Sequence, residues 1–276
     1  MKKLMIAILS ILTINTTTLA QYYYKDIVSP LIAKNDQSDY KAASVRTINI
    51  KSFEANGEPT EDFICEKKIS KDYKTASLFT RTGQSGPSLM KSFFDDKGYL
   101  TGTVDSSKIS ASNIQYYYDN SNRLIKITSS SKSNDEDFEN NITEEHLYEY
   151  NQANSPVKMT KIKNGHDSTV YLFSTDESHN VTIEKDTKTG AKYYYYYDNQ
   201  HRLTDIVHAN EYSQKLIADY LFEYNSNGKM SQMTATEAGD SNYTIWKYTY
   251  ENNLRIMERF FTKEKKLLGR IEYEYK

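Results

Sequence analysis

Short stretches in which aromatic and polar residues alternate recur along most of this chain. In residues 220–224 the first, third and fifth positions are aromatic, and residues 246–250 repeat that pattern. A period of two is typical of a β-strand whose two faces have different surroundings. The one hint of a helical period lies in residues 26–34, where Pro30 argues against a long helix. The pattern therefore predicts a chain built almost entirely of strands.

A seven-position motif follows several of these strands. It consists of an aromatic residue, Asp or Asn, two polar residues, Gly, Asn or His, any residue, and an aliphatic residue. Clear copies begin at Phe94, Tyr118, Tyr197 and Tyr224. Weaker copies place further anchor aromatics at positions 150, 173, 250 and 275, so that successive anchors lie 23 to 32 residues apart. Such regular recurrence indicates one small structural unit repeated in tandem.

The residue types of the motif identify the unit as a β-hairpin. Asp or Asn suits the first position of a type I turn, where its side chain caps the backbone. The fourth position of the loop requires a residue that tolerates positive φ, and it holds Gly98, Asn122, His201 and Gly228. A type I turn followed by a left-handed residue is a common hairpin connection. Apolar residues three apart after the turn predict a β-bulge or two partly covered faces.

We therefore expect an all-β fold, an antiparallel meander of tandem β-hairpin repeats that forms a twisted open sheet or a partly rolled half-shell. The expected divisions are a signal peptide at 1–20, an N-terminal β region with degenerate repeats at 21–90, and hairpin repeats at 91–276. A final strand ending at Tyr275 would leave an unpaired edge. Such an edge invites oligomerisation through strand pairing between chains.

Two copies of the motif resemble the YD repeats of the Rhs/teneurin family. They combine Tyr118-Asp119 with Arg123-Leu124, and Tyr197-Asp198 with Arg202-Leu203, and the resemblance covers residues 91–276. It implies hairpins that spiral into large shells, with roles in toxin delivery, encapsulation or cell-surface adhesion. Because the chain is shorter than an enclosing shell and shows no toxin domain, the delivery role is not expected. The chain is instead similar to the small stand-alone exported repeat proteins of Bacteroidetes-type bacteria.

The first twenty residues have the pattern of a secretory signal. Lys2 and Lys3 precede an apolar run at residues 4–14, and small residues lead to a cleavage point after Ala20. The alternative to a signal peptide is that the apolar run forms a buried N-terminal strand. The run is shorter than the roughly 20 residues that a membrane-spanning helix needs. The expected location is therefore the periplasm, the cell surface or the medium of a bacterium. Cys65 is the only cysteine. It lies in an alternating, strand-like run, so we expect it to be buried and to act as a small hydrophobic residue.

Composition narrows the range of functions. The 35 basic and 37 acidic residues give a net charge of −2, so the chain lacks the basic surface that draws in nucleic acid. The mean hydropathy of −0.76 predicts no transmembrane span. The five histidines show no metal-binding spacing, and the acidic run at 135–139 lacks the Gly and distal Glu of an EF-hand loop. We expect no catalytic residue, no metal and no cofactor.

Tyrosine is the residue type that points to a function. The chain has 25 tyrosines, and three clusters, at residues 22–24, 116–118 and 193–197, place rings on both faces of the expected sheet. The candidate ligand-binding residues are Tyr117, Tyr118, Tyr194, Tyr195, Tyr196 and Tyr197. Whichever row is left uncovered would bind a polysaccharide or an envelope protein surface. The other interpretation is that tyrosine only stabilises cross-strand pairs.

The first functional hypothesis is thus an exported, non-enzymatic scaffold or binding protein that recognises a glycan or a protein surface. The alternative is a periplasmic carrier, in which a rolled sheet encloses an apolar or lipidated ligand. Leu203, Met230 and Met233 would line the hollow of that carrier. A third hypothesis, an outer-membrane barrel, is weakened by Lys and Glu on both faces of the expected strands.

Overall fold

The computed structural model describes residues 21–276 except 84–85, 134–140, 211–214 and 238–241. The expected signal peptide and acidic run therefore lie outside the described residues. A π-helical segment, η1 (Tyr23–Val28), leads into α1 (Ser29–Ala42). The strands that follow are β1 (Thr47–Glu54), β2 (Ile64–Ile69), β3 (Thr75–Thr82), β4 (Gly86–Phe94), β5 (Leu100–Ser107), β6 (Ser110–Tyr118), β7 (Leu124–Ser133), β8 (Asn141–Tyr150), β9 (Pro156–Lys163), β10 (Asp167–Thr175), β11 (Val181–Asp186), β12 (Lys192–Tyr197), β13 (Leu203–Ala209), β14 (Leu216–Tyr224), β15 (Met230–Thr236), β16 (Tyr243–Glu251), β17 (Leu254–Phe261) and β18 (Leu267–Tyr275).

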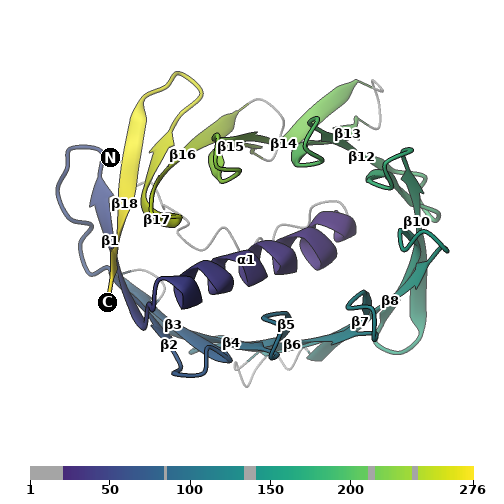
Figure 1. The fold of residues 1–276 in the computed structure, drawn as a ribbon, viewed down its shortest axis with the longest axis horizontal. Helices are drawn as coiled ribbons and strands as arrows, with labels where there is room; N and C mark the ends of the chain where they lie inside the picture. The colour runs from purple at the N-terminus through teal and green to yellow at the C-terminus, as the bar shows by residue number, and fades with distance from the viewer. Residues whose placement is uncertain (1–20, 84–85, 134–140, 211–214, 238–241) are drawn as a thin grey trace.

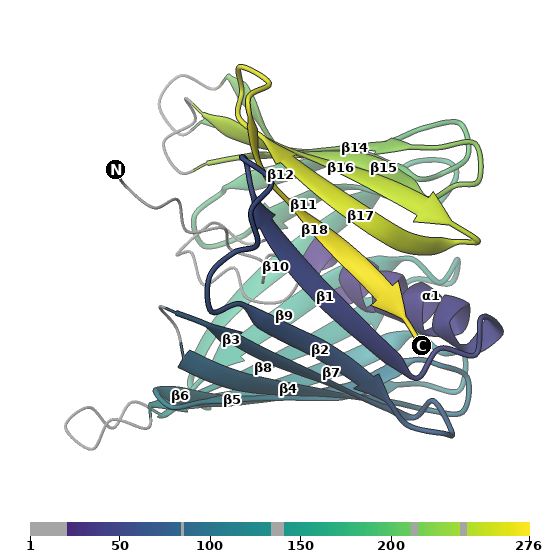
Figure 2. The same ribbon diagram turned by 90° about the vertical axis from the view of Figure 1, so that its left-hand side faces the viewer.

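The strands form one antiparallel sheet that closes on itself. Each strand pairs with its neighbours in sequence, and β1 pairs with both β2 and β18. At this seam Ile48 lies opposite Tyr275, and the carbonyl oxygen of Lys276 accepts hydrogen bonds from the N–H groups of Arg46 and Thr47. Figure 2 shows β1 and β18 side by side along the wall. The meander is as expected, but the open sheet or half-shell is corrected to a closed barrel.

Closure also corrects the expectation of an exposed edge. The strand ending at Tyr275 has β17 on one side and β1 on the other, so both rows of its backbone groups are engaged. Twist, together with the bulges in several of the hairpins, curves the sheet until the first and last strands meet. Oligomerisation through that edge is therefore not available to the closed barrel.

A helix lies inside the ring of strands. Figure 1 shows α1 crossing the interior of the oval from the side of β1 and β3 towards the side of β10. The β region expected from residue 21 onward thus begins only at Thr47, which corrects that part of the expectation. Pro30 is the second residue of α1 and directly follows the π-helical η1, so it stands where the hydrogen-bond pattern changes and not within the regular α-helix.

The tips of the hairpins have the predicted turn geometry. The backbone N–H of Asn122 bonds to the carbonyl of Asp119, and the same bond joins His201 to Asp198 and Gly228 to Asn225. The predicted left-handed residues have positive φ, 80° at Gly98, 60° at Asn122, 61° at His201 and 76° at Gly228. The register shifts by one residue at the base of each of these tips, which confirms the expected bulges.

The anchor tyrosines join each repeat to the one before it. Five of their hydroxyls donate to a carbonyl near the start of the preceding outgoing strand: Tyr118 to Leu100, Tyr150 to Leu124, Tyr197 to Val181, Tyr224 to Leu203 and Tyr275 to Arg255. The O···O distances are 2.6–2.9 Å. Their rings contribute to two apolar clusters between the wall and the two ends of the helical segment.

Candidate functional site

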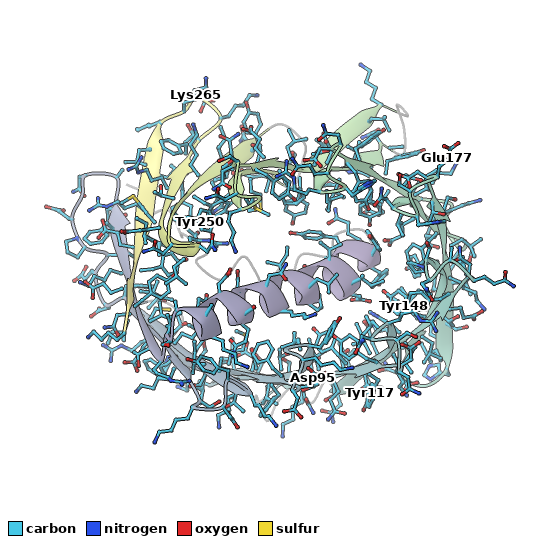
Figure 3. All side chains as sticks on the ribbon, in the orientation of Figure 1. Asp95, Tyr117, Tyr148, Glu177, Tyr250 and Lys265 are labelled. Atoms are coloured by element: carbon cyan, nitrogen blue, oxygen red, sulfur yellow. The ribbon has the colours of Figure 1, made fainter. Side chains whose placement is uncertain are left out.

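The wall sorts the candidate tyrosines into two rows. Along β12, Tyr195 is 1% exposed and Tyr196 is 46% exposed, because neighbouring side chains point to opposite faces. On β6 the pair Tyr117 and Tyr118 divides in the same way, and Figure 3 shows Tyr117 on the outer side of the ring. The row facing the lumen is Tyr118, Tyr195 and Tyr197, and the row facing outward is Tyr117, Tyr194 and Tyr196.

The inward row is engaged in internal contacts. Tyr195 donates a hydrogen bond to Glu184 at 2.8 Å, and the hydroxyls of Tyr118 and Tyr197 bond to backbone carbonyls. Burial raises the pKa of Tyr118 and Tyr197, so both phenols stay protonated as donors. These three side chains hold the barrel together, and the outward row is the one left for a partner.

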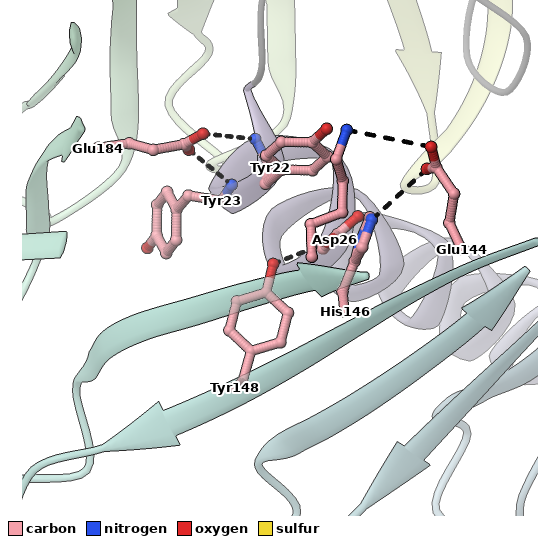
Figure 4. A network of polar contacts seen from close by, with 8 residues as sticks. Tyr22, Tyr23, Asp26, Glu144, His146, Tyr148 and Glu184 are labelled. Carbon is pink, nitrogen blue, oxygen red and sulfur yellow. Dashed lines mark hydrogen bonds and ion pairs between the residues drawn. The ribbon is translucent and has the colours of Figure 1, made fainter. Parts of the chain in front are cut away.

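A network of buried polar groups joins the helical segment to the wall (Figure 4). The Asp26 carboxylate of η1 lies 2.6 Å from His146 Nδ1 and accepts a hydrogen bond from the Tyr148 hydroxyl at 2.8 Å. Glu144 lies 3.8 Å from His146 Nε2. Burial alone would lower the pKa of His146, but the carboxylates of Asp26 and Glu144 outweigh it and raise the pKa to about 9. His146 is therefore a cation at neutral pH.

Glu184 caps the start of the helical segment from across the barrel. Its carboxylate, on β11, accepts the backbone N–H groups of Tyr22 at 3.0 Å and Tyr23 at 2.9 Å. A helix start carries unpaired N–H groups and a partial positive charge, so a carboxylate stabilises it. Burial raises the pKa of Glu184 to about 7 against the opposing effect of these donors and of Tyr195.

Charged groups also meet at the other end of α1. Asp39 pairs with Lys229, and the Gln37 side chain donates to the carbonyl of Tyr73 at 2.7 Å. Burial raises the pKa of Asp36, while the charges of Arg255 and Lys67 oppose that rise. The helix is thus held at both ends by the wall, and between them part of its surface stays exposed, with Leu31 at 44%.

Sequence reasoning did not find these luminal residues. His146 and Glu184 occupy inward positions of strands that also place apolar or aromatic residues inward, such as Tyr148 and Val181. A charge at an inward position was the available signal, because a buried charge requires a partner. That partner is the helical segment, which the alternation pattern did not predict.

The residues expected to line a carrier cavity do face inward. Leu203 is buried in the larger apolar cluster, and Met230 and Met233 pack against it. Residues of the helical segment pack against the same cluster: Tyr22, Tyr23, Tyr24, Ile27 and Val28. The chain's own N-terminal segment therefore occupies the place where the carrier hypothesis puts a ligand.

A trough lies on the outer wall above β4, β5 and β6. Phe93, Gly102 and Gln115 stand side by side in register across these strands. The hollow, of about 410 Å³, is also lined by Thr101, Val104, Asn113, Tyr116 and Tyr117. Phe93 is 37% exposed and Tyr117 is 42% exposed, and the Tyr117 hydroxyl donates to Gln115 Oε1 at 2.6 Å. Of the predicted site residues, only Tyr117 belongs to this trough.

The remaining candidates have structural roles. His201 supplies the left-handed residue of a turn, and Cys65 is buried, where burial raises its thiol pKa. Within the described ranges, no three His, Cys, Asp or Glu side chains gather closely enough to hold a metal ion. In that same part of the chain, no helix is long and apolar enough to cross a lipid bilayer.

No family model and no curated protein matches this sequence. Among solved structures, a porin-like protein from Bacteroides uniformis is 9% identical, with a TM-score of 0.39, over 84% of this chain and 98% of that one. A porin-like protein from Bacteroides vulgatus is 10% identical, with a TM-score of 0.35, over 72% and 97%.

The Tc holotoxin pore of Photorhabdus luminescens is 10% identical, with a TM-score of 0.35, over 79% of this chain. The matched region spans only 12% of that toxin chain. At these scores and identities, none of the three assigns a function to this protein.

Proposed function

We propose that this chain is an exported, non-enzymatic scaffold that binds a glycan through aromatic residues on the outside of the barrel. The observation that carries the proposal is the division of the tyrosines. The inward rings are buried against the chain's own helical segment, whereas Tyr117, Tyr194 and Tyr196 face outward. Exposed aromatic rings provide flat apolar surface with a polar rim, which suits stacking against sugar rings.

The outer wall is suited to an aqueous surrounding. Outward-facing charges pair across neighbouring strands, including Lys126 with Glu145 at 2.8 Å and Lys158 with Glu149 at 2.7 Å. Exposed pairs of this kind contribute little to stability, about 0–1 kcal/mol each. Their presence beside the aromatic residues supports a wall that meets a hydrated partner such as a polysaccharide. The resemblance to YD repeats, with its link to cell-surface adhesion, agrees with this proposal.

The carrier hypothesis is less well supported by the same geometry. Its lining residues, Met230 and Met233, pack against the same buried cluster as the residues of η1. A lipid or lipidated ligand would have to displace a segment that Glu184 and His146 hold through several hydrogen bonds and ion pairs. Because breaking a buried ion pair is costly, the contacts that hold this segment in place favour the outer wall as the binding surface.

The test is a binding screen of the chain from residue 21 against polysaccharides and envelope proteins. A variant with Tyr117→Ser, Tyr194→Ser and Tyr196→Ser should lose binding while keeping its melting temperature, because these rings face outward. The inward variant Tyr118→Phe should keep binding. Binding to an envelope protein but to no polysaccharide, or unchanged polysaccharide binding by the triple variant, would refute the proposal.

A further inference from the structure

The trough above β4, β5 and β6 is built around a missing side chain. Gly102 lies between Phe93 on β4 and Gln115 on β6, in the same outward-facing row. A Cβ atom on Gly102 would lie 3.1 Å from the carbonyl oxygen of Ile114 and 3.7 Å from Cδ2 of Phe93. Any larger residue at this position would therefore fill the floor of the hollow and press on its side.

The lining residues of the trough are uncharged. Two aromatic rings, those of Phe93 and Tyr117, are both more than a third exposed beside it. Amide groups come from Asn113 and Gln115, and a hydroxyl comes from Thr101. This set of residues offers apolar ring faces together with hydrogen-bond donors and acceptors, and it offers no counter-charge. It fits a ligand that is flat, neutral and rich in hydroxyl groups.

The size of the trough agrees with that chemistry. Its volume of about 410 Å³ falls in the usual range for small-molecule sites, roughly 300–1,000 Å³. The Tyr117 hydroxyl is already held by Gln115 Oε1, which fixes the phenol ring at the edge of the hollow. A ring that is fixed before binding loses little side-chain entropy when a ligand stacks on it.

We propose that this trough binds pyranose rings of a neutral oligosaccharide. The C–H face of the sugar packs against Phe93 and Tyr117, and its hydroxyls bond to Asn113, Gln115 and Thr101. The inference rests on the proposed function, since it takes the ligand to be a glycan. It adds the site, the neutral class of sugar and the residues that select it.

The experiment measures binding by isothermal titration calorimetry with the chain from residue 21. The probes are short neutral oligosaccharides of glucose, N-acetylglucosamine, mannose and xylose, together with acidic oligogalacturonate. Tyr117→Ala and Phe93→Ala remove the rings, and Gly102→Val fills the floor. Phe79→Ala is the matched control, because the Phe79 ring is as exposed as that of Phe93, at 37%, but lies on β3 and does not line the trough. Melting temperatures confirm that each variant is folded.

We expect at least one neutral oligosaccharide to bind, with affinity lowered about tenfold or more in the trough variants and unchanged in Phe79→Ala. A tenfold change corresponds to about 1.4 kcal/mol. Neutral oligosaccharides that bind the trough variants as tightly as the original chain would overturn this site. If the triple tyrosine variant loses that binding all the same, the proposed function stands without the trough. Tighter binding of oligogalacturonate would overturn the neutral class, and binding of none of the probes would overturn both proposals.

Discussion

At the scale of single residues, the repeated motif is explained by contacts that recur from tip to tip. The Asp119 carboxylate accepts the N–H groups of Ser121 and Arg123 and pairs with the Arg123 guanidinium at 2.6–2.7 Å. That guanidinium lies over the ring of Tyr150, the anchor of the next repeat. Asp198, Arg202 and Tyr224 repeat the arrangement. Each motif residue therefore stabilises either its own turn or its neighbour.

Removing one anchor hydroxyl should destabilise the barrel measurably. Tyr150→Phe keeps the ring but leaves the carbonyl of Leu124 without its hydrogen bond, so we expect a loss of about 1 kcal/mol. Urea unfolding measures the change. Tyr196→Phe, which alters an outward-facing ring of the same type, is the control and should change stability by less than half as much. Equal effects in the two variants would contradict the structural role of the anchor.

At the scale of elements, the strands could be predicted from the sequence and the helix could not. Alternation and turn residues are local signals, so the tips at Asp119 and Asp198 were located correctly. The segment 23–42 lacks a strong local helical signal, and its contacts include residues more than a hundred positions away, such as His146 and Glu184. Tertiary packing stabilises such a helix more than its own propensity does. The luminal charges were missed for the same reason, since their partners lie on this helical segment.

The ion pair between Asp26 and His146 should be among the most sensitive contacts of the helix. His146→Ala leaves the Asp26 carboxylate buried without its cation, and breaking a buried pair costs about 3–5 kcal/mol. Glu145→Ala, one residue away on β8 and paired outward with Lys126, should cost no more than about 1 kcal/mol. Chemical unfolding of both variants tests this contrast, which would disappear if the helix were held mainly by apolar contacts.

Stability should fall as the pH rises from about 5 to about 9. The pKa of His146 is raised from 6.5 to about 9, so its contribution is complete below 6.5 and is lost as the pH passes 9. The pKa of Glu184 is raised from 4.5 to about 7. Its burial therefore begins to lower the stability as the pH rises above 4.5, and this loss is complete above pH 7. Urea midpoints at several pH values test this, and His146→Ala should flatten the upper part of the curve. A midpoint that rises with pH would be the opposite result.

At the scale of the whole molecule, closure of the barrel was beyond local sequence signals. The alternation of residues 47–54 and of 267–275 is the same whether the two strands pair or stay apart. Their pairing depends on the total curvature that all the intervening hairpins add together, which no single repeat specifies. The sequence could predict that Tyr117 and Tyr118 point to opposite faces of the sheet, because they are neighbours in one strand. Which of them faced the solvent depended on the direction in which the sheet closed.

Removing the last strand should turn a closed molecule into one that associates. A chain ending at residue 266 lacks β18, so the edges of β1 and β17 lose their partner. Exposed edges pair readily with other chains, and we expect dimers or larger species by light scattering after gel filtration. The control is Ile109→Ser, which changes an exposed side chain next to β6. This variant should have the same oligomeric state as the full chain. A well-folded monomer without β18 would show that the seam is dispensable.

The seam between β1 and β18 also constrains the order of folding. The first strand and the last are more than two hundred positions apart, so their contact is the least local in the barrel and the entropy of bringing them together is the greatest. Every hairpin between them can form as soon as its own residues are available. One edge of β1, however, can pair only after β18 is available. In a chain that crosses a membrane from its N-terminus, the ring can be completed only after Lys276 has emerged.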